Sequence, residues 1–344
     1  MTMHVTLGGV ARILLAGGLF MAAPSPAAAH EGWGVVVDAQ GRVYVTDIPA
    51  NTIWRISPDG RVEAVGREIH SHALSLGRDG AVYGTHTSLT EPVRGVWRLD
   101  ASGRFADVIP PTRDFPLGLQ SFLLGPDGSV YSASVYQYPE PAGGRELHLL
   151  HWSPTGVVDT VAGGRVGNAD GIGRSAQFQS IDGMAWLPGG AIVVADGARL
   201  RRVTLDGRVE SLGEPLTERR WDQDLLGVAV GPDGAIYAAD FASRVVHHLI
   251  GGRAKRLYEP DGFWAPAGIA VTADGVYVLE HPRAPLGILG DLGAGPYLRV
   301  RKFGADSRAV TLTTRWGRLS QEVAGAAVLI AGAVLSMVWI RRRG

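Results

Sequence analysis

Four polar residues of the chain could together hold a metal ion or move a proton. They are Glu31, His70, His72 and Asp182. Imidazole nitrogens and carboxylate oxygens suit a hard or borderline divalent cation, which with one open coordination position would polarise a carbonyl or activate water. We predict Glu31, His72 and Asp182 as its ligands and His70 as a general base, since histidine titrates near neutral pH. The alternative is a polar channel filled with water.

A sequence repeat supplies the elements that must position these residues. Short apolar segments bracket a glycine turn six times, with the turn glycines at Gly41, Gly80, Gly128, Gly190, Gly234 and Gly275. Each unit has room for about four strands, which is one blade of a β-propeller. We therefore predict an all-β fold, a six-bladed β-propeller, over residues 30–317.

The repeat places the candidate residues on one face of the propeller. Because the glycine turn joins the first two strands of a blade at one end, the first strand begins and the second strand ends at the other. We call that side the channel face. Its candidate ligand-binding residues are Gln120, Asp224, Glu280 and His281, and His86 is a second candidate base.

A recurrent aspartate ends the second strand in three units, at Asp47, Asp196 and Asp240. For these we predict a structural role, with the carboxylate accepting backbone N–H bonds from the following loop. His86 and Glu280 replace the aspartate in their own units. Such a departure from the repeat indicates either a functional residue or a solvated loop residue.

Two segments resemble known propeller families. Residues 161–196, with Gly167, Asn168, Asp170 and Gly171 before an innermost strand, resemble the NHL repeat. Residues 31–48 resemble the opening blade of the senescence marker protein/gluconolactonase propellers. That resemblance implies a divalent metal held by Glu31 and, at the later metal position, Asp182. The family's intervening asparagines are replaced by Gln120 and Leu226.

Composition narrows the function classes. The chain has 344 residues, no cysteine and a formal net charge of zero. The missing cysteines exclude disulfides, a thiolate nucleophile and zinc–sulfur sites. Without a basic stripe, we expect no nucleic-acid partner.

Both ends of the chain predict export and membrane attachment. Residues 1–29 have an apolar run followed by a small-x-small pattern, typical of a cleavable signal peptide. After a short linker at 318–322, residues 323–340 form an uncharged apolar run long enough to cross a bilayer core of about 30 Å. The basic tail at 341–344 would then be cytoplasmic and the propeller periplasmic or at the cell surface. A sorting tail that is later removed would have the same pattern.

Two functions remain open from the sequence. The first is a binding module whose channel face takes a small molecule, a glycan or an envelope protein. The second is a hydrolase or lyase that uses one divalent cation, calcium or another, with His70 or His86 as the base. Propellers of these families include lactonases, lyases and binding scaffolds, so the fold does not decide between them.

Overall fold

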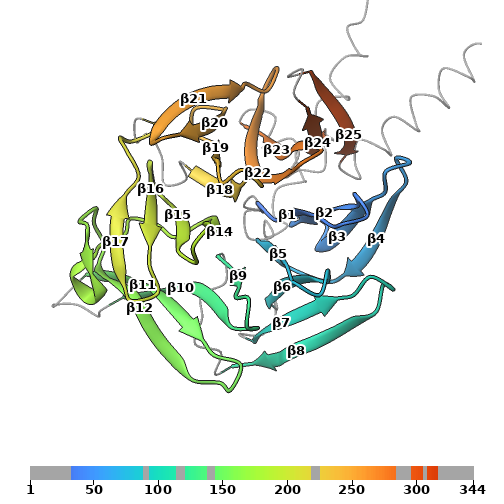
Figure 1. Ribbon diagram of the computed structural model, residues 1–344. Helices are drawn as coiled ribbons and strands as arrows, with labels where there is room; N and C mark the ends of the chain where they lie inside the picture. Colours follow the sequence, from blue (N-terminus) through green and yellow to red (C-terminus); the bar gives the residue numbers. More distant parts are fainter. Residues whose placement is uncertain are drawn as a thin grey trace, which may run out of the picture. The chain divides into compact units, whose positions relative to one another are not determined.

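The computed structural model describes residues 32–87, 93–113, 121–137, 144–217, 225–283, 296–304 and 308–316. These residues form a six-bladed β-propeller, in which six antiparallel sheets stand around a common centre (Figure 1). The predicted fold class is therefore confirmed. The innermost strands are β1, β5, β9, β14, β18 and β22.

Each blade is one continuous stretch of chain. Blade 1 contains β1 (Val35–Val37), β2 (Val43–Asp47), β3 (Thr52–Ile56) and β4 (Val62–Arg67). Blade 2 contains β5 (Leu74–Leu76), β6 (Val82–Thr87), β7 (Arg94–Leu99) and β8 (Phe105–Thr112). Blade 3 contains β9 (Leu123–Leu124), β10 (Val130–Gln137), β11 (Arg145–Trp152) and β12 (Val158–Arg165).

The second half repeats this order with one addition. Blade 4 contains β14 (Met184–Trp186), β15 (Ile192–Asp196), β16 (Arg199–Val203) and β17 (Arg208–Ser211), and β13 (Gly171–Ile172) adds a fifth strand beside β17. A short 3-10 helix, η1 (Gly173–Ser175), follows β13. Blade 5 contains β18 (Leu225–Val230), β19 (Ile236–Asp240), β20 (Val245–Ile250) and β21 (Arg253–Tyr258). Blade 6 contains β22 (Trp264–Thr272), β23 (Gly275–Pro282), β24 (Pro296–Phe303) and β25 (Ala309–Trp316).

The predicted turn glycines join the first two strands of their blades. All six have positive φ, between 73° and 146°, which glycine adopts without steric cost. In blade 1 the Gly41 N–H donates to the Asp38 carbonyl at 2.9 Å. Blade 6 has a tighter hairpin, in which Thr272 pairs directly with Gly275. The turns fix which ends of the strands form the channel face.

A second set of glycines lets neighbouring blades approach closely at the centre. A Cβ atom on Gly183 would lie 2.4 Å from the Leu226 carbonyl oxygen, and one on Gly227 would lie 2.6 Å from that of Ala267. These distances are too short for any side chain, so the first strands of blades 4, 5 and 6 are packed backbone against backbone. This contact explains why glycine opens several of the repeats.

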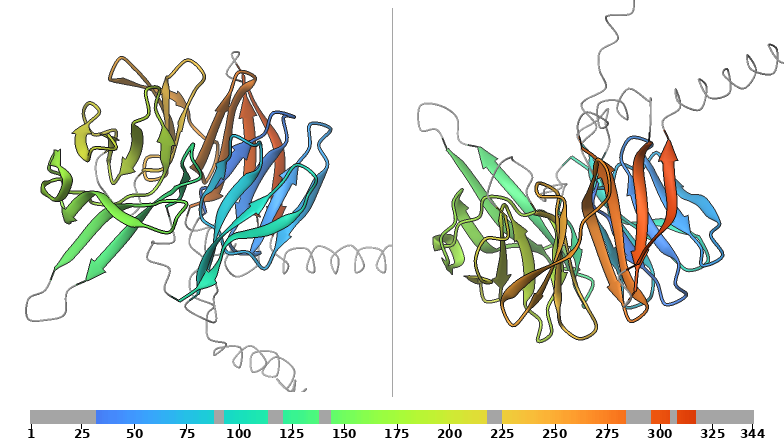
Figure 2. Two further views of the ribbon diagram at one scale, coloured as in Figure 1. Left: turned by 60° about the horizontal axis from the view of Figure 1, so that its bottom comes forward. Right: turned by 90° about the horizontal axis from the view of Figure 1, so that it is seen from above.

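Blades 6 and 1 close the ring without exchanging a strand (Figure 2). A Cβ atom on Gly268 would lie 2.2 Å from the Trp33 carbonyl oxygen. The Tyr297 hydroxyl donates to Asp47 Oδ2 at 2.9 Å. The Arg315 guanidinium lies 3.8 Å from the centre of the Trp54 ring. Beneath these contacts both blades share one apolar core, formed by Val35, Val37, Val43, Val45, Ile56, Tyr277, Leu279, Leu298 and Val300.

The predicted signal peptide, linker, membrane span and basic tail (residues 1–29, 318–322, 323–340 and 341–344) lie outside the described residues. Within the described ranges, no helix is long and apolar enough to cross a membrane. Because the strands of each blade alternate in direction, β25 ends on the same face on which β1 begins.

Candidate functional site

A pair of buried histidines lies on the channel face where blade 1 meets blade 2. The ring centres of His70 and His72 are 5.0 Å apart, edge to face, and the Trp33 ring lies 5.6 Å from His72. All three side chains are at most 8% exposed. The Trp33 and Gly34 N–H groups both donate to the His72 carbonyl, at 2.9 and 2.7 Å, so the His72 backbone is held against the residues that lead into β1.

Asn51 orients the outer histidine. Its side-chain oxygen lies 3.1 Å from His70 Nδ1, and its own carbonyl accepts the Ile69 N–H at 2.9 Å. Asn51 has φ 46°, a left-handed conformation that asparagine tolerates better than most residues. With Nδ1 donating to Asn51, Nε2 is the ring nitrogen that carries no hydrogen in a neutral His70. Asn51 was not predicted as a site residue, although asparagine is a common residue where a loop requires positive φ.

The centre of the propeller next to the histidines is apolar. One buried cluster joins residues from five blades: Trp33, Ala73, Val96, Phe122, Val130, Leu226, Phe241, Ala265 and Ala267. Among the described residues, the buried Trp33 indole N–H has no hydrogen-bond acceptor. Buried polar groups nearly always have a hydrogen-bond partner, so the acceptor for this indole is expected from outside the described residues.

The predicted metal ligands are only partly described. Glu31, and the candidate ligand-binding residues Gln120 and Asp224, lie outside the described residues. Asp182 is half-buried, and its backbone N–H donates to the Ala195 carbonyl at 3.1 Å. In the described part of the chain, no three His, Asp or Glu side chains are grouped to hold a metal ion. A metal site with His72 and Asp182 therefore depends on Glu31 and stays a prediction.

His86 lies in a separate cavity. A groove of about 510 Å³ between blades 1 and 2 is lined by Val65, Gly66, Arg67, Glu68, Ile69, His86, Trp97, Phe105, Asp107 and Pro111. Trp97 and Phe105 are stacked in its wall, with ring centres 5.0 Å apart. As a base, His86 would serve this groove, so His70 is the stronger candidate at the channel mouth.

The recurrent carboxylates are structural, and each pairs with a side chain of the third strand. Asp47 accepts the Ala50 N–H at 3.0 Å, and Asp240 accepts the Ser243 N–H at 2.7 Å, as predicted for the following loop. Asp196 differs, because its backbone donors at 2.6 and 3.0 Å, Gln179 and Ser180, precede the first strand of the blade. The third-strand partners are Trp54 for Asp47, Arg201 for Asp196 and His247 for Asp240.

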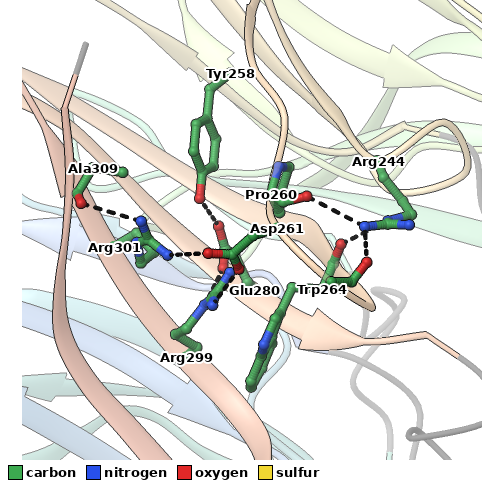
Figure 3. Close-up of polar contacts among 10 residues, drawn as sticks. Arg244, Tyr258, Pro260, Asp261, Trp264, Glu280, Arg299, Arg301 and Ala309 are labelled. Atoms are coloured by element: carbon green, nitrogen blue, oxygen red, sulfur yellow. Dashed lines mark hydrogen bonds and ion pairs between the residues drawn. The ribbon is translucent and has the colours of Figure 1, made fainter.

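Glu280, predicted as a ligand-binding residue, belongs to the same structural set (Figure 3). Its side chain is fully buried, Oε2 accepts from Arg299 Nε at 2.5 Å, and Oε1 accepts from the Tyr258 hydroxyl at 2.8 Å. Burial raises the pKa of Glu280, while the Arg299 charge opposes the rise. With both oxygens engaged, this carboxylate braces blade 6.

Arg299 connects Glu280 to the loop before blade 6. Its Nη1 donates to Asp261 Oδ1 at 2.7 Å, and its guanidinium lies 4.5 Å from the centre of the Trp264 ring (Figure 3). The Arg299 hydrogen bond lowers the pKa of Asp261. The network therefore links the loop before β22 to the ends of β23 and β24.

His281, the other predicted ligand-binding residue of blade 6, holds the ring closed. Its Nε2 lies 2.9 Å from the Gly32 carbonyl and its Nδ1 lies 3.1 Å from the Tyr297 carbonyl. The side chain is 4% exposed. Both contacts are with backbone oxygens, so His281 has a structural role at the junction of blades 6 and 1.

The loop that resembles the NHL repeat is also held by an ion pair. Asp170 Oδ1 accepts from Arg201 Nη2 at 2.7 Å and from the Ser211 hydroxyl at 3.0 Å. The same arginine donates from Nη1 to Asp196 Oδ2 at 2.7 Å, and its side chain is fully buried. The aspartate of this motif therefore anchors its loop to the third strand of blade 4.

No protein-family model and no curated protein matches this chain. Its fold is similar to several solved structures. A putative gluconolactonase is 18% identical, with 73% of this chain and 86% of that chain covered and a TM-score of 0.53. A gluconolactonase from Xanthomonas campestris is 12% identical, with 73% and 83% covered and a TM-score of 0.53. A catalytically inactive virginiamycin B lyase from Staphylococcus aureus, with quinupristin, is 14% identical, with 73% and 92% covered and a TM-score of 0.50. At these identities the likeness shows the propeller fold, in agreement with the resemblance predicted from the sequence.

Proposed function

We propose that the channel face binds a small organic molecule at the site formed by Trp33, His70 and His72. The observation that carries the proposal is the Trp33 indole N–H, buried beside the histidine pair without an acceptor among the described residues. An apolar wall with a few convergent polar groups is the usual make-up of a small-molecule site. The ligand expected here has an apolar body and one acceptor oxygen.

The binding proposal is tested by removing the indole donor while keeping an aromatic ring. Trp33→Phe should weaken binding by about tenfold, because one hydrogen bond from a buried donor is lost. Isothermal titration with quinupristin and benzoate as probes measures the change. Trp186→Phe is the matched control, since its indole N–H is already satisfied by the Leu124 carbonyl at 2.8 Å. If no probe binds, or if both variants lose affinity equally, the proposal is wrong.

A second candidate function is a hydrolase or lyase at the same place. It is favoured by the orientation of His70 by Asn51 and by the fold shared with gluconolactonases and a lyase. In this case His70 Nε2 accepts the proton that the reaction releases. A divalent cation held by Glu31, His72 and Asp182 would stabilise developing negative charge on oxygen.

The enzyme proposal predicts a measurable turnover and a bound metal. His70→Gln should lower the rate of δ-gluconolactone hydrolysis, followed by pH-stat, by about 10²–10⁴-fold, as expected for loss of a general base. Elemental analysis of the purified protein should give one divalent cation per chain, lost in Asp182→Ala. If the folded protein contains no metal and turns over neither the lactone nor quinupristin, the enzyme proposal is wrong and only the binding proposal remains.

We also propose that the propeller is exported and held at the membrane by residues 323–340. The apolar run and the arginines that follow it support this placement. Because β1 begins and β25 ends on the channel face, the anchor would keep this face near the bilayer. Cell fractionation with and without residues 318–344 tests the anchor, and recovery of both forms in the cytosol would contradict it.

A further inference from the structure

The buried carboxylate of blade 5 has a different kind of partner from its counterparts. Asp47 pairs with the indole of Trp54, Asp196 with the guanidinium of Arg201, and Glu280 with that of Arg299. These groups are permanent donors. In blade 5 the corresponding side chain is His247. An imidazole, unlike an indole or a guanidinium, can exist with or without its second proton under ordinary conditions. The repeat therefore contains a titratable pair at one position.

The geometry fixes which nitrogen of His247 faces the carboxylate. Nε2 lies 3.0 Å from Asp240 Oδ2, and Asp240 Oδ1 accepts the Ser243 N–H at 2.7 Å. Asp240 is fully buried and His247 is 6% exposed. Because the carboxylate accepts, Nε2 carries the hydrogen, which leaves Nδ1 for another partner. Within the described ranges no protein group bonds to Nδ1.

His247 lines a cavity of about 590 Å³ between blades 4 and 5. The polar residues around the cavity are Glu214, Ser243, His247, Arg253 and Arg256. Arg256 is the cross-strand neighbour of His247 on β21, next to a bulge between Val246 and His247. Arg256 also contacts Glu259 at 3.2 Å, and its side chain is 64% exposed, so its guanidinium remains accessible.

Charge in this cavity favours an anion. Arg253, Arg256 and Glu214 line it, and protonation of His247 would add a further positive charge while Asp240 balances it from behind. The cavity volume is within the range of small-molecule sites. Guanidinium groups bind carboxylate and phosphate oxygens through paired hydrogen bonds.

We propose that this cavity is a second ligand site, for a small molecule with a carboxylate or phosphate group, which Arg253 and Arg256 bind together with protonated His247. The ligand oxygen accepts from His247 Nδ1, and Asp240 keeps the ring oriented through Nε2. The groups around His247 are Asp240, Arg256 and, along the cavity wall, Arg253 and Glu214. Aspartate, glutamate and arginine side chains keep their charge near neutral pH, so the proton taken up on binding is assigned to the histidine. Binding therefore takes up a proton, and affinity falls as the pH rises.

The test is isothermal titration of the full-length protein with sulfate and with succinate at about pH 6.5 and about pH 8.5. Both probes are essentially dianions over this range, so a change in affinity reports the protein. We expect binding to be at least about fivefold tighter at the lower pH, consistent with one additional charge-assisted hydrogen bond. Tighter sulfate binding would indicate a phosphate or sulfate ester, and tighter succinate binding a carboxylate.

Two pairs of variants make the result decisive. Arg253→Gln with Arg256→Gln should weaken binding by at least about tenfold, whereas substitution of Arg202, a partly exposed arginine of β16 paired with Glu210, by Gln should not. His247→Gln should remove the pH dependence, whereas His248→Gln should keep it, because His248 stacks on Tyr237. The proposal is overturned if neither probe binds, or if the pH dependence persists in His247→Gln.

Discussion

Replacing Arg201 with methionine is expected to lower the free energy of unfolding by about 3–5 kcal/mol, the cost of breaking a buried ion pair from one side. The guanidinium is fully buried and donates to Asp196 at 2.7 Å and to Asp170 at 2.7 Å. It also bonds the Gln177 and Ala169 carbonyls at 3.1 and 3.0 Å. Chemical denaturation followed by circular dichroism measures the loss.

The neighbouring residue provides the control for Arg201. Arg202 is 39% exposed and pairs with Glu210 at 3.6 Å, so Arg202→Met should cost at most about 1 kcal/mol. Adding Asp196→Asn to Arg201→Met should restore part of the stability, because the buried charge is removed. Equal losses in Arg201→Met and Arg202→Met would show that the buried pair contributes no more than a surface pair.

The loss caused by Arg201→Met should shrink at acid pH. Burial raises the pKa of Asp196, although the Gln179 and Ser180 amides and Arg201 oppose it. A carboxyl group whose pKa is raised on folding stabilises the protein below its unfolded pKa, and that contribution disappears as the pH rises through the folded pKa. Without Arg201 the pKa of Asp196 rises further. The difference from the wild type should therefore narrow as the pH falls from about 7 to about 4.5.

The architecture was predictable from the sequence because it depends on local signals. The turn glycines, from Gly41 to Gly275, stand between apolar segments, and each has the positive φ that such a turn requires. Asp47 and Asp240 were also predicted correctly, since a carboxylate that accepts an N–H three residues later is a local motif. Local periodicity is therefore sufficient for strands, turns and blade number.

The roles of Glu280 and His281 were not predictable in this way. Glu280 is bound by Tyr258 and Arg299, which lie 22 and 19 residues away in sequence, and His281 contacts Gly32 across 249 residues. The departure from the repeat at Glu280 left a functional residue and a solvated loop residue as alternatives, whereas in the structure this longer carboxylate is buried and accepts from Arg299. The third-strand partners follow a spacing that is visible in the sequence, because Trp54 and His247 both lie seven residues after the aspartates that they contact.

The second large effect is expected at the junction that closes the ring. Gly268→Ala would place Cβ 2.2 Å from the Trp33 carbonyl oxygen, and backbone on both sides leaves no flexible group to move away. The blades must separate, which weakens the contacts from His281 to Gly32 and from Tyr297 to Asp47. We expect a loss of about 1–3 kcal/mol, typical of overpacking, measured by chemical denaturation.

Gly231→Ala is the matched control for Gly268→Ala. Its Cβ would meet Asp233 Oδ1 at 2.6 Å, but Asp233 is an exposed side chain that can rotate away, so the cost should be smaller. Opening the junction also moves Trp33, because the new Cβ atom at position 268 would clash with the Trp33 carbonyl oxygen. Gly268→Ala should therefore weaken ligand binding at the channel face as well as stability, whereas Gly231→Ala should leave binding unchanged. Unchanged stability and binding in Gly268→Ala would mean that the ring is not closed by this backbone contact.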